Sequence, residues 1–248
     1  MKFKLITHID RINYFSDGFI KYYKKFFHPE EFYFLVYYSK NYKEIISYLS
    51  KHGFDVDKQV KQYNLYKHYV SSANAHLQNE VKTRFIKEGF TVIYSPQDER
   101  LFHPDLRNYI INNLKDYIRA KGIVIVQHNE PPLDTSKPLL SQRNYCVAGT
   151  TLYDKTSILK KDFTWAPGRH NSPKVLGEKI DVDENIYLID IGKSCIDIAL
   201  ENNKESVLLY EKLNNYYNIT DRDAIEKKFG EQSVQPIPEA IKKFSTFF

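Results

Sequence analysis

The chain has 248 residues, of which 42% are hydrophobic and 27% charged, and its formal net charge is +5. This composition excludes a disordered chain, and the length fits one large α/β domain or two small ones. The mild positive charge favours anionic partners, but no dense run of Lys and Arg demands nucleic acid. Only two cysteines occur, Cys146 and Cys195, which excludes a disulfide framework and a zinc quartet.

Membrane and export signals are not evident in the sequence. No stretch approaches the ~18 uninterrupted apolar residues of a membrane span, and residues 1–8 lack the apolar length of a signal peptide. We therefore expect a cytoplasmic protein without a membrane span, or one attached peripherally to a membrane.

The first hundred residues alternate between strand and helix patterns. Strands are predicted at residues 3–6, 31–38, 54–56 and 91–94, and helices at residues 18–27, 41–51 and 74–88. Asp17 is expected to cap the first helix, and Gly53 and Gly89 to end the second and third. This order predicts an α/β fold with a mainly parallel central sheet, right-handed crossovers and flanking helices.

The second half lacks this regular alternation of strands and helices. It is expected to contain a helix at 106–117, a strand at 123–127, a Pro-rich loop at 129–138, a strand at 186–191 and a helix at 195–203. Residues 1–205 are predicted to form the α/β domain. Residues 206–248 are predicted to form a helical C-terminal extension, which Pro236 and Pro238 interrupt before a last helix.

Two acidic residues and a histidine follow the 91–94 strand. Pro96, which cannot donate to a sheet ladder, ends that strand and leads to Asp98, Glu99 and His103. Ligands bind at the carboxyl edge of open α/β sheets, so the loops at 7–10 and 98–103 should converge there. Carboxylates suit Mg²⁺ or Mn²⁺, which prefer oxygen ligands and usually keep phosphate oxygens. The pattern indicates a nucleotide-diphosphate site, although a solvated turn would also place acids here.

The order strand, Asp98-Glu99, apolar residue and His-Pro-Asp resembles the metal-binding loop of family 2-like glycosyltransferases of the GT-A fold. Further stretches are similar to that family in the same order and extend the resemblance over roughly residues 3–205. They are the Gln-Arg segment within 138–145, Tyr153-Asp154-Lys155, the Trp-Ala-Pro-Gly-Arg-His run at 165–170, and the strand and helix around 187–191 and 197–201.

The resemblance implies a GT-A-like nucleotide-diphospho-sugar transferase. Such an enzyme moves a sugar from a nucleotide-sugar donor, most often a UDP-sugar, to a hydroxyl of a glycan or another acceptor, which includes a modified nucleic-acid base. Mn²⁺ or Mg²⁺ would sit on the diphosphate, where a divalent ion stabilises the leaving group.

Individual roles follow from the matched positions and from side-chain chemistry. The metal ligands are expected to be Asp98, Asp190 and His170. The donor-binding residues are expected to be Thr7, His8, Asp10, Gln142, Arg143, Trp165, Gly168 and His170. The catalytic residues are expected to be Asp98 and Glu99, with Asp154 or Glu130 as the base if the mechanism is inverting. The sequence leaves a retaining mechanism open as well.

Structural roles stay open for several of these residues. Glu99 could instead be a charge at a helix N-terminus, Arg143 could form a buried pair with Asp154, and Trp165 could pack in the core.

Two departures from the family pattern bear on the metal. Pro96 stands where the first motif Asp is expected, and Asp190 stands where the late strand usually carries His. Asp is still an oxygen ligand, so the site is either a harder metal site or one that has been lost. The alternative functions are a Mg²⁺-dependent nuclease, a nucleic-acid-binding protein and a non-catalytic, sugar-binding relative.

Overall fold

A computed structural model describes residues 1–37, 41–63, 71–148, 154–165, 180–192, 194–195, 197 and 234–242. The chain divides into two units. The first consists of Met1–Gly122 with Thr150–Leu188, and the second of Ile123–Gly149 with Ile189–Phe248.

Four parallel strands form the centre of the first unit, in the order β3-β2-β1-β4. They are β1 (Lys2–Ile9), β2 (Phe32–Tyr37), β3 (Val60–Tyr63) and β4 (Phe90–Tyr94). Leu5 of β1 lies opposite Phe32 of β2 on one side and Ile93 of β4 on the other. The predicted parallel pairing is therefore confirmed for this part of the chain.

Beyond β4 the pairing becomes antiparallel. β8 (Lys155–Leu159) pairs with β4, Val92 facing Leu159. The first residues of β6 (Tyr117–Val126) pair with β8 in the same sense. The fold is thus α/β with a mixed sheet, less uniformly parallel than the sequence predicts.

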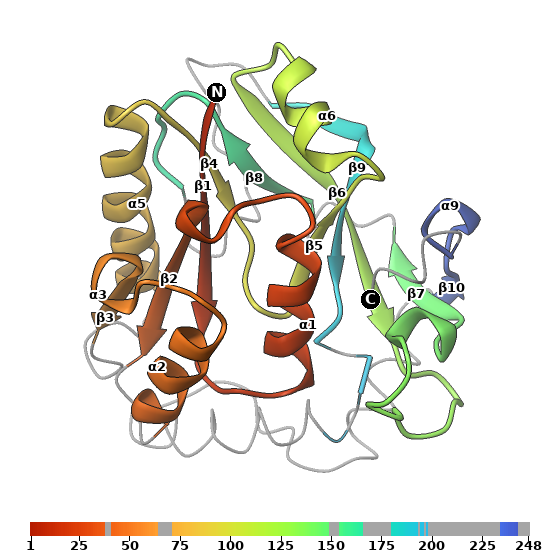
Figure 1. Ribbon diagram of the computed structural model, residues 1–248. Coiled ribbons are helices and arrows are strands. Elements are labelled where there is room, and N and C mark those ends of the chain that lie inside the picture. Colours follow the sequence, from red (N-terminus) through yellow and green to blue (C-terminus); the bar gives the residue numbers. More distant parts are fainter. Residues whose placement is uncertain are drawn as a thin grey trace. The chain divides into compact units, whose positions relative to one another are not determined.

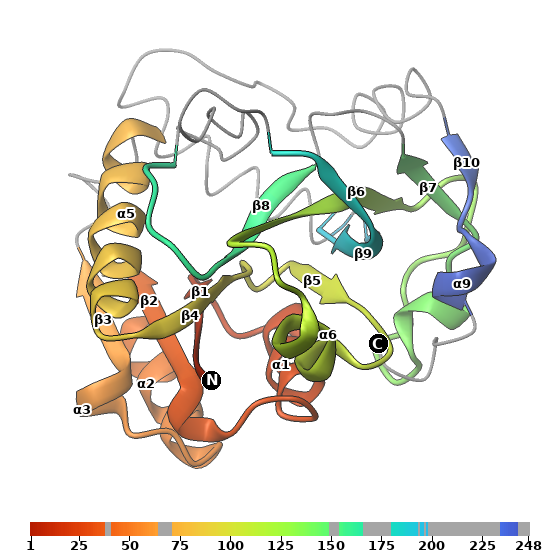
Figure 2. The ribbon, with the colours of Figure 1, turned by 90° about the horizontal axis from the view of Figure 1, so that it is seen from above.

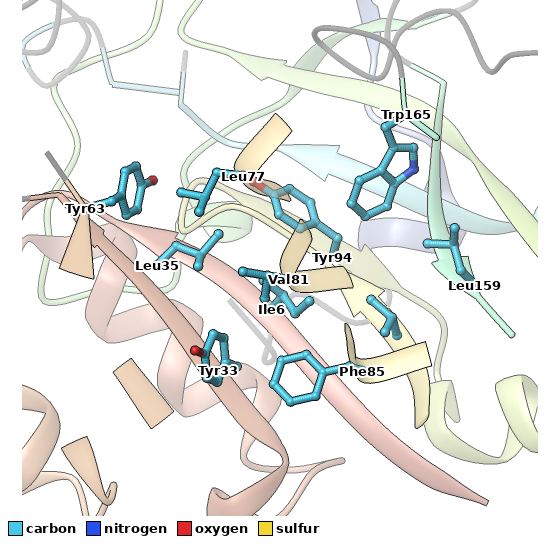
Figure 3. Packing of buried hydrophobic residues seen from close by; sticks show 11 residues of the cluster. Ile6, Tyr33, Leu35, Tyr63, Leu77, Val81, Phe85, Tyr94, Leu159 and Trp165 are labelled. Atoms are coloured by element: carbon cyan, nitrogen blue, oxygen red, sulfur yellow. The ribbon is translucent and has the colours of Figure 1, made fainter. Parts of the chain in front are cut away.

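Side chains alternate between the two faces of the parallel strands, as the two-residue period of a strand requires. Figures 1 and 2 show α1 (Tyr14–Tyr23) and α2 (Tyr42–Lys51) on one face and α5 (Ser71–Lys87) on the other. Figure 3 shows the cluster beneath α5, where Leu77, Val81 and Phe85 lie at four-residue spacing. They meet Ile6, Tyr33, Leu35, Val92, Tyr94, Leu159 and Trp165 from the strands and the 160–165 segment. Buried apolar area of this kind is the main source of stability.

Helix α1 begins earlier than predicted. Its N-cap is Asn13, whose side chain accepts hydrogen bonds from the backbone N–H groups of Phe15 and Ser16. The Ser16 hydroxyl accepts from the Asn13 N–H in return, which completes a capping box. The prediction that Asp17 caps this helix is wrong, because Asp17 lies inside it and pairs with Lys21.

The segment after α2 also differs from the prediction. α2 and its end at Gly53, where φ is +82°, are confirmed. The predicted strand at 54–56 is wrong, because Asp55 caps a short helix, α3 (Val56–Gln59), by accepting a hydrogen bond from the Lys58 N–H. Strand β3 follows α3 directly.

Residues 99–117 depart from the prediction in a similar way. Glu99–Phe102 forms a strand, β5, rather than a loop, and β5 pairs with β9 (Val182–Asp190), most of which belongs to the same unit. Helix α6 (Leu106–Asn112) ends before the predicted 117, where β6 starts instead. The Gly89 end of α5 is confirmed, with φ of +83°.

The second unit contains the end of β6, which pairs antiparallel with β7 (Tyr145–Ala148). β10 (Val234–Pro236) pairs with β7, and α9 (Glu239–Lys242) follows it. The predicted C-terminal extension thus includes a strand that its sequence did not reveal, ending at a proline as strands at a sheet edge often do. The rest of the extension, and most of the predicted 195–203 helix, lie outside the described residues.

A buried carboxylate ties α6 to β9. Asp183 is 3% exposed and accepts hydrogen bonds from Asn113, Lys115 and the Asn185 backbone at 3.2–3.3 Å. Burial opposes ionisation of this carboxyl. Hydrogen bonds from Tyr109, Asn185 and Lys115 outweigh burial and lower the pKa of Asp183 below its ordinary value.

This carboxylate makes stability sensitive to acid. Its folded-state pKa is depressed, so its stabilisation is complete above the unfolded-state pKa of about 3.9 and is lost as pH falls through the lower folded value. Urea midpoints should therefore fall more for the wild type than for Asp183→Asn between about pH 6 and about pH 3. Asp57→Asn, which removes an exposed carboxylate on α3, is the control and should follow the wild type. Parallel curves for Asp183→Asn and the wild type would contradict this role.

Candidate functional site

The two predicted loops meet at the carboxyl edge of the parallel strands. The Gln97 side-chain amide donates a hydrogen bond to Oδ1 of Asp10, joining the segment after β4 to the end of β1. Asp10 is 40% exposed at its side chain and pairs with Arg11 at 3.4 Å. The predicted convergence is confirmed, and it brings Asp10, Arg11, Gln97 and Asp98 to one edge.

Strand β1 runs further than predicted, which changes the position of two candidate residues. Thr7 and His8 lie within β1 rather than in the loop, because Ile9 still pairs with Val36 of β2. Thr7 is fully buried and His8 is 9% exposed. Only Asp10, of the four residues at 7–10, follows the strand.

His8 lies in a polar and aromatic group on the α5 side of the sheet. The Tyr63 hydroxyl is 2.5 Å from its Nδ1, and Nε2 of Gln78 is 3.3 Å from its Nε2. The Tyr94 ring meets the imidazole edge-on, with centroids 5.6 Å apart. Four elements, β1, β3, β4 and α5, thus hold this histidine at the carboxyl end of β1.

A tight turn presents Asp98. The Glu99 N–H donates to the Pro96 carbonyl at 3.0 Å, so Gln97 and Asp98 are the central residues of a β-turn. The Ser95 hydroxyl donates to the Glu99 carbonyl at 2.8 Å and closes the same turn. Asp98 is partly exposed, whereas Glu99 beyond it is buried.

Glu99 forms a buried ion pair with Lys155 of β8. The Lys155 ammonium donates to Oε1 of Glu99, and the two side chains are 12% and 5% exposed. The alternative that Glu99 is a charge at a helix N-terminus is wrong, because Glu99 opens strand β5. Lys155 belongs to the Tyr-Asp-Lys stretch that resembles the family, but its pairing with Glu99 was not predicted from the sequence.

Trp165 is packed in the cluster of Figure 3. It is 2% exposed, it meets Tyr94 edge-on, and the Lys82 ammonium lies 5.4 Å from its ring. The Asn79 side chain exchanges two hydrogen bonds with the Trp165 backbone. This is the core-packing role that the sequence left open, and stacking on a sugar would require the ring to leave this packing.

Glu130, Gln142 and Arg143 belong to the second unit. Oε1 of Glu130 accepts hydrogen bonds from the backbone and side chain of Asn144, and Oε2 is 3.8 Å from Nε of the buried Arg143. The Arg143 side chain also donates to the carbonyls of Ser194 and Gln142. The ion-pair partner of Arg143 is therefore Glu130. Asp154 of the first unit instead accepts from the Gly122 N–H at 2.7 Å.

The remaining predicted metal ligands are placed only in part. Asp190 ends β9, and its Oδ1 accepts a hydrogen bond from the Gly192 N–H at 2.9 Å. His170, the other predicted ligand, lies outside the described residues, and so does Gly168, which was predicted to bind the donor. Within the part of the chain that the structure describes, no three His, Cys, Asp or Glu side chains form a group that could hold a metal ion.

Two arginines near this edge were not singled out from the sequence. Arg11 follows Asp10, and Arg100 follows Glu99 in a strand that is buried at all four positions. A charged pair at the start of the short run Glu-Arg-Leu-Phe is a weak sign of a polar site beneath a loop. It could have drawn attention to Arg100.

None of the described helices has both the length and the apolar composition of a membrane-spanning helix.

The Glu99–Lys155 pair gives a test of stability. Lys155→Met would leave a buried carboxylate without its cation, so the free energy of unfolding should fall by about 3–5 kcal/mol. The double variant Lys155→Met/Glu99→Leu should recover most of that loss, because a buried apolar pair needs no charge compensation. Urea denaturation measures both, and Lys58→Met, which opens the exposed pair with Asp55, should change stability little. A double variant as unstable as Lys155→Met would contradict the pairing.

No protein-family model matches this chain, and no curated protein matches it. Among solved structures, it is similar to a crystal structure of S. aureus TarS 1-349, with 11% identity, a TM-score of 0.35, and coverage of 92% of this chain and 70% of that chain. A second crystal structure of S. aureus TarS gives 11% identity and a TM-score of 0.36, and the match covers 92% of this chain and 43% of that one.

Proposed function

We propose that this chain is a glycosyltransferase of the GT-A type that transfers a sugar from a UDP-sugar to an acceptor hydroxyl. The observation that carries the proposal is the Gln97–Asp10 hydrogen bond, which joins the Asp98 turn to the end of β1 at the carboxyl edge of the parallel strands. The sequence motifs around Asp98, Asp154 and Trp165 support it, because they occur in the family's order.

Asp98 and Asp10 are the acidic groups that we assign to a divalent ion at this edge. Mg²⁺ and Mn²⁺ are usually held by one or two carboxylates together with substrate phosphate oxygens, so two carboxylates from neighbouring strand ends fit such an ion. When bound, the ion stabilises charge on the departing diphosphate. Asp190 and His170 stay proposed as additional ligands.

Arg11 is a partly exposed cation at this edge. Its side chain is 15% exposed and lies 3.4 Å from Asp10. A guanidinium binds phosphate oxygens through two parallel N–H donors. Arg11 would therefore hold the diphosphate next to Asp98, a role that the sequence assigned to Arg143.

The group around His8 is proposed to hold the nucleoside end of the donor. Tyr63, Gln78 and His8 gather hydrogen-bonding atoms beside the Tyr94 ring, at the end of the strand that leads to Asp10. Small-molecule sites commonly combine aromatic walls with a few converging polar groups. Thr7, buried within β1, would contribute only to the position of this strand.

An inverting reaction also needs a base for the acceptor hydroxyl, and Asp154 and Glu130 both stay proposed. Each has one carboxylate oxygen tied to a backbone N–H, of Gly122 for Asp154 and of Asn144 for Glu130. Such a bond fixes the carboxylate, and the second oxygen would accept the proton. In Glu130 that second oxygen already lies 3.8 Å from Nε of Arg143. The acceptor itself, a glycan or another hydroxyl, is proposed only by class.

The first test concerns the metal and the nucleotide together. If Asp98 holds a metal–diphosphate, UDP should raise the unfolding temperature with MnCl₂ or MgCl₂ present and fail to do so in EDTA. UDP at about a hundred times its Kd should add ~2.7 kcal/mol to the free energy of unfolding. Equal stabilisation in EDTA would exclude the metal and favour Arg11 as the phosphate partner. No stabilisation in either condition would count against nucleotide binding.

The second test concerns Asp98. Asp98→Asn should lower the rate of sugar transfer by a factor of about 10²–10³, because it removes a group acting on the departing diphosphate. The unfolding midpoint without ligand should change little, since Asp98 is partly exposed. Asp57→Asn, which removes an exposed carboxylate on α3, is the control and should keep full activity. If Asp98→Asn unfolded the protein while folded molecules kept their activity, Asp98 would be a structural residue.

A further inference from the structure

Arg100 is a fully buried cation directly beneath the Asp98 turn. Its side chain is among the largest in the described part of the chain to be less than 2% exposed. Nη1 donates to the Gln97 carbonyl at 2.6 Å and to the Glu99 carbonyl at 2.9 Å, the acceptors on either side of Asp98. Nη2 donates to the Phe15 carbonyl in the first turn of α1 at 2.7 Å. One guanidinium thus joins the turn to α1.

The charge of Arg100 is compensated in an unusual way. Among the described residues, no carboxylate oxygen lies within 4.0 Å of its guanidinium, which rests instead on three carbonyls and on the Phe19 ring 5.1 Å away. Burial lowers the pKa of Arg100 to about 10, while Tyr23 and Asp98 act in the opposite direction. A buried charge is costly unless it is well hydrogen-bonded, so a charged residue that only filled space here would be a poor choice.

We propose that Arg100 is a positioning residue, which fixes the Asp98 turn against α1 before any ligand binds. The inference rests on the proposed function for its catalytic meaning, because the carboxylate that Arg100 positions is the one assigned to the metal–diphosphate. Arg100 itself is buried and touches no substrate. It acts through the two carbonyls that bracket Asp98.

The planar fork of arginine explains why lysine cannot replace it. A guanidinium reaches three carbonyls in different directions at once, whereas an ammonium on a flexible stem holds a compact point charge. Arg100→Lys therefore keeps the charge and releases part of the turn. Partners that orient a metal ligand typically alter metal affinity or activity by about 10–100-fold when they are changed.

A matched control is available in the same unit. Arg107 of α6 also binds through a fork, to Glu31 at 2.7 and 3.0 Å and to the Phe26 carbonyl at 3.1 Å, and it stacks on Phe3 near the amino end of β1. Arg107→Lys loses a comparable set of hydrogen bonds at the opposite end of the strand from Asp10. It reports the effect of an Arg→Lys change on stability alone.

The experiment combines hydrogen exchange with UDP binding. In the wild type without ligand, the Glu99 amide should be protected like the amides of β4. Arg100→Lys should speed exchange at residues 97–99 by about tenfold or more and remove the gain in UDP affinity that MnCl₂ provides, about 10–100-fold, while the UDP affinity in EDTA stays unchanged. Arg107→Lys should leave the exchange and both affinities as in the wild type.

Several outcomes would overturn the inference. One is free exchange of the Glu99 amide in the wild type. Another is an amide exchange rate at residues 97–99 that Arg100→Lys leaves unchanged. The third is a loss of UDP affinity in Arg100→Lys that is equal with and without Mn²⁺. If Arg100→Lys does not fold, free exchange of the Glu99 amide in the wild type would still overturn the inference. If the wild type binds no UDP in any condition, the proposed function fails, and hydrogen exchange still judges whether Arg100 holds the turn.

Discussion

The parallel pairing of β1 with β2 and β4 is the constraint on which the rest of the first unit depends. β1 has parallel partners on both sides, as β2 does, so its backbone groups are satisfied in two directions and its apolar residues are covered on both faces. The ladder with β4 extends one residue beyond that strand, since the Ser95 N–H donates to the Ile6 carbonyl at 3.1 Å. The chain therefore leaves the sheet after β1 and after β4 at the same edge, and the parallel geometry brings the two following segments close enough for the Gln97–Asp10 hydrogen bond.

Several charged groups are buried beside these strands, and their loss would destabilise the fold. Lys82 is 1% exposed and is held by Asp162 and the Phe163 carbonyl, Glu99 is held by Lys155, and Arg100 is held by backbone carbonyls. Each of these contacts joins segments that are distant in sequence, except the hydrogen bonds from Arg100 to the carbonyls of Gln97 and Glu99. Removing one partner of such a group costs more than the net value of the contact, because the other group stays buried without compensation. Apolar contacts are the main source of stability in this unit, and the buried charges link segments that are distant in sequence.

The sequence predicts the elements whose signals are local. β2 and β4 are runs of aromatic and β-branched residues, and α2 ends at a glycine with positive φ, so one stretch of chain suffices to identify each. β5 was missed for the opposite reason. From the local sequence, Glu99 and Arg100 are predicted to be loop residues. In the structure they belong to a strand, where Glu99 pairs with Lys155, Arg100 donates to the Phe15 carbonyl, and the strand pairs with β9. Those partners lie 56, 85 and more than 80 positions away and leave no trace in the local pattern.

The same distinction between local and distant signals applies to the candidate site. The meeting of the Asp10 and Asp98 segments could be predicted, because it requires only that the strands be parallel. The packing of Trp165 and the pairing of Arg143 with Glu130 could not, because a single residue type fits a ligand site and a core equally well. The α1 boundary shows how small the decisive signal can be. Asn13 and Ser16 form the cap through two side chains, while the acidic Asp17 next to them is a more visible but incorrect candidate.

Pro96 changes how this edge can assemble an acidic site. A motif with two carboxylates in one loop would carry its metal ligands on a single turn, whereas in the proposed site the turn would supply Asp98 and the segment after β1 would supply Asp10. The two acids are thus joined by tertiary structure, through Gln97, the β1–β4 ladder and the carbonyls that Arg100 holds. Distances between groups on separate segments are only as fixed as those contacts, so the geometry of any ligand bound by both acids depends on buried residues that never touch it.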